Sequence, residues 1–197
     1  YFMCDTPLDT DVGAGPLMNQ DLETASRLLK EGGYNGETLI LMDPTDIPVL
    51  HGASLVTAQM LRKIGAKVEV QAMDWSTLTS RRAETKSIAD GGWNIFHTYS
   101  TGADVASPIA NIGVSGGCVE EAWFGWPCDK MLEDLRDQFS RESDPAKQVE
   151  IGIALQKRAY EVVPYVNYGQ WFQPTAYRTS LKGVLISPVP FFWNIEK

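Results

Sequence analysis

Apolar residues recur at helical spacing early in the chain, and a short apolar run follows them. Residues 22–30 repeat leucine and alanine with a helical period and reach a Gly-Gly pair at 32–33, which favours a helix that ends there. Residues 38–42 then form a continuous apolar run that stops at Asp43-Pro44. This pattern is typical of a short strand that is buried on both faces.

The same order repeats further along. A helix is predicted over residues 48–64 and a strand over 67–73, with Gly65 between them. The predicted inner stripe of that helix consists of Leu50, Leu55, Val56, Met60 and Leu61. A third pair follows, with a short helix over 76–84 behind Asp74 as N-cap and a strand over 93–99. Helix and strand in alternation predict an α/β fold with a largely parallel sheet flanked by helices.

The second half of the chain is less regular. Residues 100–128 are rich in Gly, Ser, Ala and Pro but also hold aromatics, which favours a functional loop over a disordered one. Helices are predicted over 129–140 and 145–161, with Ser143 or Asp144 as the cap between them. Residues 162–171 are expected to be extended. The tail, with Pro188 and Pro190, is expected to form an edge strand at best.

Composition limits the classes of function. The chain has 197 residues and a net charge of -8, which argues against nucleic acid or an anionic membrane as a partner. Two histidines and three cysteines are too few and too scattered for a metal cluster. No stretch approaches the ~18 apolar residues of a membrane span. The opening YFMCDTP lacks the features of a signal peptide, and it resembles the middle of a longer polypeptide.

Cys118 and Cys128 flank a loop-like stretch, GCVEEAWFGWPCD. A disulfide between them would imply an oxidising compartment, whereas two reduced, buried thiols would imply nothing. The disulfide is favoured because the loop otherwise lacks a rigid element. Cys4 is left over, either free or paired with a cysteine elsewhere.

No constellation of catalytic residues is evident, so the chain is not expected to be an enzyme or to need a cofactor. Residues 113–117 (GVSGG) lack the spacing of a nucleophile elbow, and Gly13-Ala14-Gly15 does not follow a strand as a dinucleotide loop would. His51 and His97 lie in predicted regular elements and are expected to be structural.

Aromatic and small polar residues gather where strands are predicted to end. Ligands of open parallel sheets bind beyond the carboxyl ends of the strands, and aromatics provide flat walls for them. The predicted ligand-binding residues are Tyr99, Ser100, Thr101, Asp104, Trp123, Gln170 and Trp171. For Tyr99 and Trp171 a core position is an equal alternative, and the cluster around Trp123 could instead pin its loop to the surface. Trp75, Trp93 and Trp193 are expected in the core.

Ordered phrases along nearly the whole chain resemble one protein family. They are LLKEGGYNG, LRKIGAKVEVQ, MDW, GGWNIF, GCVEEAWFGWPCD, GQWFQPTAYR and the terminal FFWNIEK. Their order is similar to that in the C-terminal lobe of extracellular solute-binding proteins of the peptide and nickel class, which serve ABC importers. The resemblance implies a type II periplasmic-binding-protein-like lobe in a periplasmic receptor. Its partners would be a small solute or peptide, the N-terminal lobe and a membrane permease.

The resemblance also divides the chain. Residues 1–20 would connect from the N-terminal lobe, 21–182 would form the ligand-binding lobe and 183–197 would return toward the first lobe. Peptide-binding members typically carry an acid for the ligand amine in the loop after GGWNIF, where this chain has Asp104, and Ser107 where an Asp often precedes Pro. Either Asp104 takes that role or the ligand has no free amine. A sensor lobe of the same fold is the alternative function, and a hydrolase is a weaker one.

Overall fold

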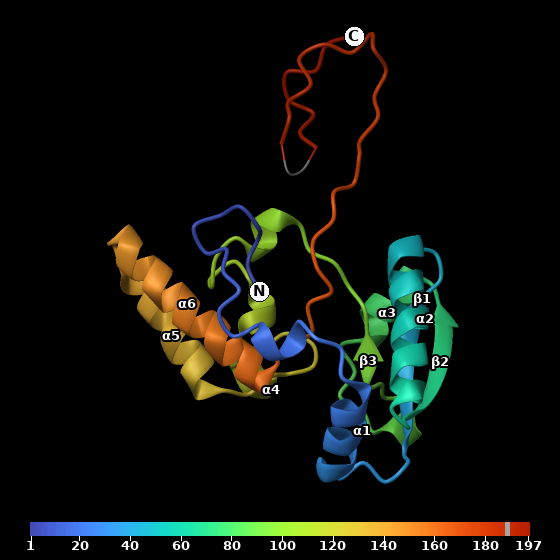
Figure 1. Ribbon diagram of the computed structural model, residues 1–197. Coiled ribbons are helices and arrows are strands. Elements are labelled where there is room, and N and C mark those ends of the chain that lie inside the picture. The colour runs from blue at the N-terminus through green and yellow to red at the C-terminus, as the bar shows by residue number, and fades with distance from the viewer. Residues whose placement is uncertain (188–189) are drawn as a thin grey trace. The chain divides into compact units, whose positions relative to one another are not determined.

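The chain forms two compact units in the computed structural model, which describes residues 1–187 and 190–197 (Figure 1). One unit is continuous and spans Asn19–Tyr99; we call it the sheet unit. The other combines Tyr1–Met18 with Ser100–Lys197, and we call it the split unit. Each is described by itself. Pro188, on which part of the tail prediction rests, lies outside the described residues.

A three-stranded parallel sheet organises the sheet unit, with strand order β2-β1-β3. Strand β1 (Thr38–Pro44) pairs along its whole length with β2 (Lys67–Met73) and through two residues with β3 (Ile95–Phe96). Leu41 and Met42 of β1 have no exposed surface, and because successive side chains point to opposite faces, both faces of this strand are covered. The largely parallel sheet predicted from the sequence is confirmed.

Three helices accompany this sheet: α1 (Leu22–Glu31), α2 (Pro48–Lys63) and α3 (Trp75–Arg81). Aspartates begin two of them. The Asp21 carboxylate accepts a hydrogen bond from the Thr24 amide at 2.9 Å, and that of Asp74 accepts one from the Thr77 amide at 2.7 Å. Both bonds satisfy amides that a helix start would otherwise leave unpaired.

The buried face of α2 differs from the predicted stripe. The helix buries Leu50, Ser54 and Ala58, which are spaced four residues apart, whereas Leu55 and Val56 are about half exposed. Helix α2 contacts both β1 and β2, and its small residues permit a close approach to them. The prediction was therefore right for Leu50 and wrong for Leu55 and Val56. The apolar residues of α2 do not by themselves show which side of the helix packs against the sheet.

The split unit contains two long helices, α5 (Lys130–Arg141) and α6 (Pro145–Val162). They pack side by side and run in opposite directions (Figure 1). Asp129 and Asp144 cap them. The buried cluster around them comprises Tyr1, Val114, Leu132, Leu135, Leu155 and Ala159. The first residues of the chain are thus part of this core.

Short helical turns occupy the segments between these elements. They are η1 (Gly15–Leu17) near the N-terminus, η2 (Ile88–Asp90) in the sheet unit, and η3 (Gly102–Val105), η4 (Ile112–Val114) and α4 (Cys118–Glu121) in the region predicted as a loop. The region between residues 100 and 128 is therefore a chain of tight turns rather than a featureless loop.

The structure corrects two expectations about the last third of the chain. Residues 163–181 hold neither helix nor strand, so Gln170 and Trp171 do not end a strand. Helix α6 instead runs on to Val162, and Val163 follows in a left-handed conformation with φ 49°. Trp193 is 71% exposed and not in the core; its ring stacks on Phe191, and an isolated bridge joins Lys182 to Glu196.

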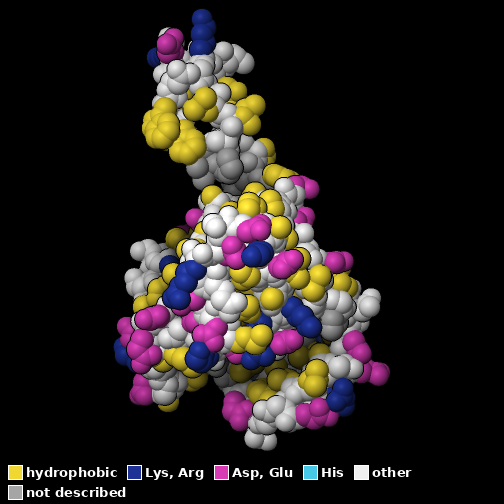
Figure 2. All heavy atoms as spheres, turned by 90° about the vertical axis from the view of Figure 1, so that its left-hand side faces the viewer, with side chains coloured by type: hydrophobic (Ala, Val, Ile, Leu, Met, Phe, Trp, Pro, Cys, Tyr) yellow, Lys and Arg dark blue, Asp and Glu magenta, His cyan; other side chains and the backbone are white. Residues whose placement is uncertain are grey.

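Within the described residues, no helix combines the length and the apolar character needed to cross a membrane. On the face drawn in Figure 2, acidic and basic side chains are interspersed rather than segregated by sign. Exposed ion pairs lie along α5, such as Lys130 with Asp134 at 2.6 Å and Arg141 with Asp137 at 3.0 Å.

Candidate ligand-binding site

Tyr99, the first predicted ligand contact, lies just beyond the end of β3 and is half exposed. Its ring stacks on that of Trp75, with centroids 6.4 Å apart and planes inclined by 13°. Trp75 is the first residue of α3, which begins directly after β2. The carboxyl ends of β2 and β3 therefore contribute one aromatic wall each, where ligands of parallel sheets bind.

A guanidinium completes this group. The central carbon of the Arg82 guanidinium lies 5.7 Å from the centroid of Trp75 and 6.0 Å from that of Phe96. Phe96 is itself covered edge-on by Trp93, with centroids 5.0 Å apart. Burial against these rings lowers the pKa of the Arg82 guanidinium, but arginine stays charged at physiological pH. We call Trp75, Arg82, Phe96 and Tyr99 the Arg82 cluster.

Sequence reasoning placed Trp75 in the core and gave Arg82 no role. Trp75 is instead half-buried and joins the site. The signal was the spacing of seven residues between Trp75 and Arg82, which is two helical turns and puts both side chains on one side of α3.

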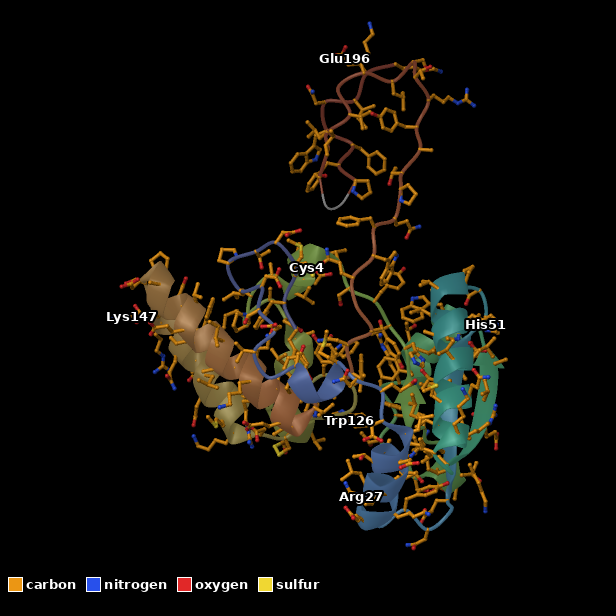
Figure 3. The ribbon with its side chains drawn as sticks, viewed as in Figure 1. Cys4, Arg27, His51, Trp126, Lys147 and Glu196 are labelled. Carbon is orange, nitrogen blue, oxygen red and sulfur yellow. A yellow bond between two sulfur atoms is a disulfide. The ribbon has the colours of Figure 1, made fainter. Side chains whose placement is uncertain are left out.

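A buried polar network lies next to the end of β1. Asp43 is 2% exposed, and both of its carboxylate oxygens lie within 3.0 Å of Nδ1 of His51, which projects from α2 (Figure 3). His97 is also buried, with Ser54 Oγ 3.2 Å from its Nδ1 and Thr57 Oγ1 2.9 Å from its Nε2. These contacts fix α2 to the strand ends and give both histidines structural roles.

Thr101 and Asp104 of the split unit form a capping box around η3. The Asp104 carboxylate accepts hydrogen bonds from the amide and the hydroxyl of Thr101, both at 2.9 Å, and the Asp104 amide returns a bond to the Thr101 carbonyl. Ser107 also serves its own loop, since its Oγ accepts from the Ala110 amide. One oxygen of Asp104 thus already has two donors, and a ligand contact by Asp104, Ser100 or Thr101 stays a prediction.

Cys118 and Cys128 are joined by a disulfide in the split unit. Within the loop that it closes, the amide of Trp126 donates to the Trp123 carbonyl at 2.8 Å, and the Trp123 ring packs on Phe124 with centroids 5.4 Å apart. Trp126 and Gly125 both have positive φ, as a tight turn requires. Trp123 is therefore a half-buried member of a compact, covalently closed turn.

Gln170 and Trp171 lie in the irregular segment after α6. The Gln170 side-chain carbonyl accepts a hydrogen bond from the Cys4 amide at 3.1 Å, and Trp171 is 47% exposed. Cys4 is free and exposed (Figure 3). Gln170 thus links the start of the chain to this segment, and its predicted contact with ligand stays a prediction.

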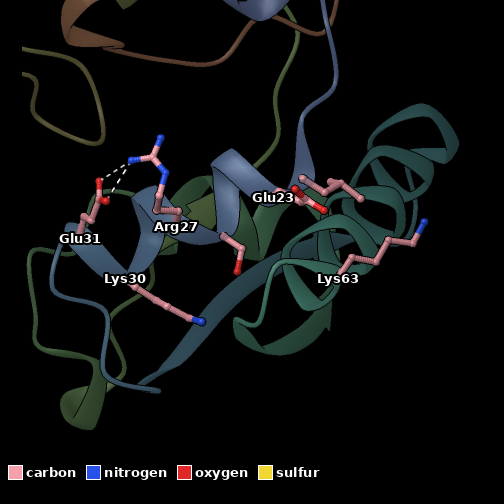
Figure 4. A pocket seen from close by; sticks show the side chains of 7 residues that line it. Glu23, Arg27, Lys30, Glu31 and Lys63 are labelled. Carbon is pink, nitrogen blue, oxygen red and sulfur yellow. Dashed lines mark hydrogen bonds and ion pairs between the residues drawn. The ribbon is translucent and has the colours of Figure 1, made fainter.

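A hollow of about 520 Å³ lies beside α1 (Figure 4). Its lining residues are Leu22, Glu23, Ser26, Arg27, Lys30, Glu31 and Lys63. Glu31 ends α1 and Lys63 ends α2, and each helix leads into the start of a strand. The hollow is therefore at the amino ends of the strands, not at the edge where parallel sheets bind ligands.

Comparison with known proteins identifies the relatives of the chain. No family model matches it. A protein of Sinorhizobium fredii, described as a probable peptide ABC transporter periplasmic-binding protein, is 35% identical over 177 residues, which make up 90% of this chain and 33% of that protein. The chain is homologous to part of a peptide-type periplasmic-binding protein. The resemblance stated from the sequence is confirmed, and the chain spans about a third of the length of this relative.

Two solved structures of binding proteins are similar in fold to this chain. An ABC transporter substrate-binding protein from Listeria monocytogenes matches with a TM-score of 0.67 at 17% identity, over 82% of this chain and 32% of its own. A periplasmic binding protein from Agrobacterium tumefaciens, solved with agropinic acid, matches with a TM-score of 0.66 at 21% identity, over 83% and 32% respectively. The type II periplasmic-binding-protein fold predicted from the sequence is confirmed.

Proposed function

We propose that the chain is the solute-recognition lobe of a substrate-binding protein that serves an ABC importer. The observation that carries the proposal is 35% identity, over 90% of the chain, to a protein described as such a binding protein. In this proposal residues 21–182 form the ligand-binding lobe, residues 1–20 and 183–197 connect it to an N-terminal lobe, and that lobe provides the other half of the site.

The work of such a lobe is capture rather than chemistry, since the relatives described above are binding proteins. Solute would bind against the strand-end aromatics Trp75 and Tyr99, and closure of two lobes would enclose it. The closed protein would then deliver the solute to a membrane permease. A periplasmic location accords with the disulfide between Cys118 and Cys128, because such bonds persist in oxidising compartments.

The ligand class in this proposal is a peptide or another small polar solute. The Sinorhizobium relative is described as peptide-related, whereas the Agrobacterium structure holds agropinic acid. One fold therefore accommodates different solutes in different proteins, and the ligand is decided by the side chains of the site.

Mass spectrometry of solute that copurifies with the full-length protein tests the proposal. We expect a small polar molecule at one copy per protein, bound at least tenfold more weakly by the 197-residue chain in calorimetry, because half of the enclosing surface is missing from it. A full-length protein that binds no solute would contradict the proposal. Solute binding without any effect of gene deletion on uptake would favour the sensor role instead.

A further inference from the structure

The connection between α1 and β1 contains an asparagine that is followed by a glycine. Asn35 and Gly36 lie between Glu31, which ends α1, and Thr38, which begins β1. Asn35 is exposed to solvent, and Gly36 has a positive φ of 93°. An asparagine side chain in this position can react with the amide of the next residue, because glycine has no side chain that would shield that amide or restrict its rotation.

The Gly36 amide has no competing contact among the described residues. Their hydrogen bonds do not include one from the Gly36 N–H, and neither α1 nor β1 includes this residue. The Asn35 side chain is held at the turn, because its Nδ2 donates to the Gly33 carbonyl at 2.9 Å. That bond engages the nitrogen of the side-chain amide and leaves its carbonyl carbon open to attack. The two groups that would react are therefore neighbours in the chain, and neither is committed elsewhere.

A lysine from the neighbouring strand lies beside this peptide. A Cβ atom at Gly36 would be 3.5 Å from Nζ of Lys67, the first residue of β2. A positive charge at this place favours the deprotonated form of the Gly36 amide, which is the attacking nucleophile. The Glu37 carboxylate is the other charge of the turn, and it accepts from the Asn35 amide at 2.9 Å rather than from that of Gly36.

We propose that Asn35 is a modification site at which the chain deamidates spontaneously. The Gly36 nitrogen bonds to the side-chain carbonyl carbon of Asn35, the side-chain nitrogen leaves as ammonia with the proton of the Gly36 amide, and a succinimide ring forms. Water then opens the ring at either carbonyl, which yields aspartate or isoaspartate. The reaction uses no reagent except water. The inference goes beyond the proposed function and does not depend on it.

The modification alters a turn that connects the starts of two strands. The Tyr34 hydroxyl donates to the Glu37 carbonyl at 2.6 Å and accepts from the Lys67 amide at 2.8 Å, so the turn before β1 is tied to the start of β2. Isoaspartate adds one carbon to the main chain between Tyr34 and Glu37, whereas aspartate adds only a charge. Isoaspartate should therefore weaken these contacts more than aspartate does.

Peptide mapping by mass spectrometry tests the proposal. The chain is incubated at pH 8 in water enriched in heavy oxygen, so that each deamidation event marks its peptide with a solvent oxygen. Asn19 and Asn167 are internal controls, because both are exposed and lie outside helices and strands but precede Gln20 and Tyr168. We expect Asn35 to react at least about tenfold faster than either control, since only glycine leaves the following amide unshielded. Equal rates at the three asparagines would overturn the proposal.

Variants of the neighbouring lysine test the structural part of the argument. Lys67→Gln should slow the reaction of Asn35 at least about twofold in the folded chain, since a unit charge a few ångströms away acts on this scale even in water. The difference should vanish in concentrated urea, where Lys67 no longer lies beside Gly36. Lys86→Gln removes an exposed lysine of the same unit that pairs with Glu84, and it should leave the rate unchanged. Equal rates in folded wild type and Lys67→Gln would overturn the role given to the ammonium group.

The products themselves test the effect on the turn. Anion exchange separates the deamidated chain from the unreacted one, because each reaction adds a negative charge, and peptide mapping then gives its isoaspartate content. An isoaspartate-rich fraction should unfold at a lower urea concentration than Asn35→Asp, which carries the same charge on an unaltered main chain. Equal urea midpoints of the two would overturn the weakening of the turn that we infer from the Tyr34 contacts.

Discussion

The Thr57 hydroxyl oxygen lies 2.9 Å from Nε2 of His97, on the side of the ring opposite Ser54. The Ser54 hydroxyl donates to the Leu50 carbonyl at 2.9 Å, so it accepts from Nδ1–H of His97. In the neutral ring, Nε2 then accepts from Thr57. A protonated ring would donate at both nitrogens, and the Thr57 hydroxyl would then be an acceptor.

Stability should depend on this histidine at mildly acidic pH. Burial lowers the pKa of His97 below its ordinary value of 6.5, so the unfolded chain binds the proton more tightly than the folded one. We expect the free energy of unfolding to decrease as the pH falls below about 6.5. Urea denaturation at pH 8, 6.5 and 5 measures this, and His97→Gln should flatten the profile. An identical pH slope in wild type and variant would contradict the assignment.

The disulfide should contribute to stability although the loop is short. Replacing Cys118 and Cys128 together by Ser should lower the free energy of unfolding by about 2–3 kcal/mol, because a closed loop restricts the unfolded chain. Cys4→Ser alters a free, exposed thiol and is the matched control, with no expected change. Alkylation without reductant, followed by mass measurement, should label Cys4 alone; labelling of all three cysteines would refute the bond.

Asp129 should matter more than other paired acids of α5. Its carboxylate caps the helix through the Leu132 amide and pairs with Arg158 of α6, and this pairing lowers the pKa of Asp129. Asp129→Ala should cost about 1–2 kcal/mol in the free energy of unfolding, because it removes the cap and one of the two carboxylates that pair with Arg158, which keeps Glu161. Asp137→Ala, which breaks an exposed pair with Arg141, should cost less than about 0.5 kcal/mol. Equal losses in the two denaturation curves would disprove the distinction.

Helix α2 provides a test of its observed orientation. Leu50 is 3% exposed and Leu55 is 50% exposed, so Leu50→Ala should destabilise the chain by about 2–5 kcal/mol. The same truncation at Leu55 should cost less than about 1 kcal/mol, since substitutions of exposed side chains usually change the free energy of unfolding only slightly. Thermal melts of both variants measure the difference. A larger loss at Leu55 would restore the stripe predicted from the sequence.

Local signals explain which parts of the fold could be predicted. Strand β2 matches its predicted bounds of 67–73, and the starts of α2 and α6 coincide with Pro48 and Pro145, because proline tolerates only the first turn of a helix. Burial could not be predicted in the same way. Whether Trp193 is covered depends on its tertiary neighbours, and the sequence of the tail does not contain them.

The candidate site was predictable only in part, for a similar reason. Tyr99 followed from the rule that ligands meet strand ends, whereas Trp75 and Arg82 needed their shared side of α3 to be recognised. The spacing of Thr101 and Asp104 is that of a capping box, and this signal was available before the structure. The spacing predicts that the Asp104 carboxylate caps the η3 turn, a role that the acidic side chain alone does not indicate.

The division of the chain has a consequence for its synthesis. The sheet unit is continuous in sequence, whereas the split unit joins the first 18 residues to those after Tyr99. On the ribosome, the sheet unit is therefore complete while α5 and α6 have still to be made, and the Tyr1 side chain lacks its partner Ala159 until nearly all of α6 has emerged. The segment Tyr1–Met18 therefore completes its packing only after the whole sheet unit and most of α6 have been made.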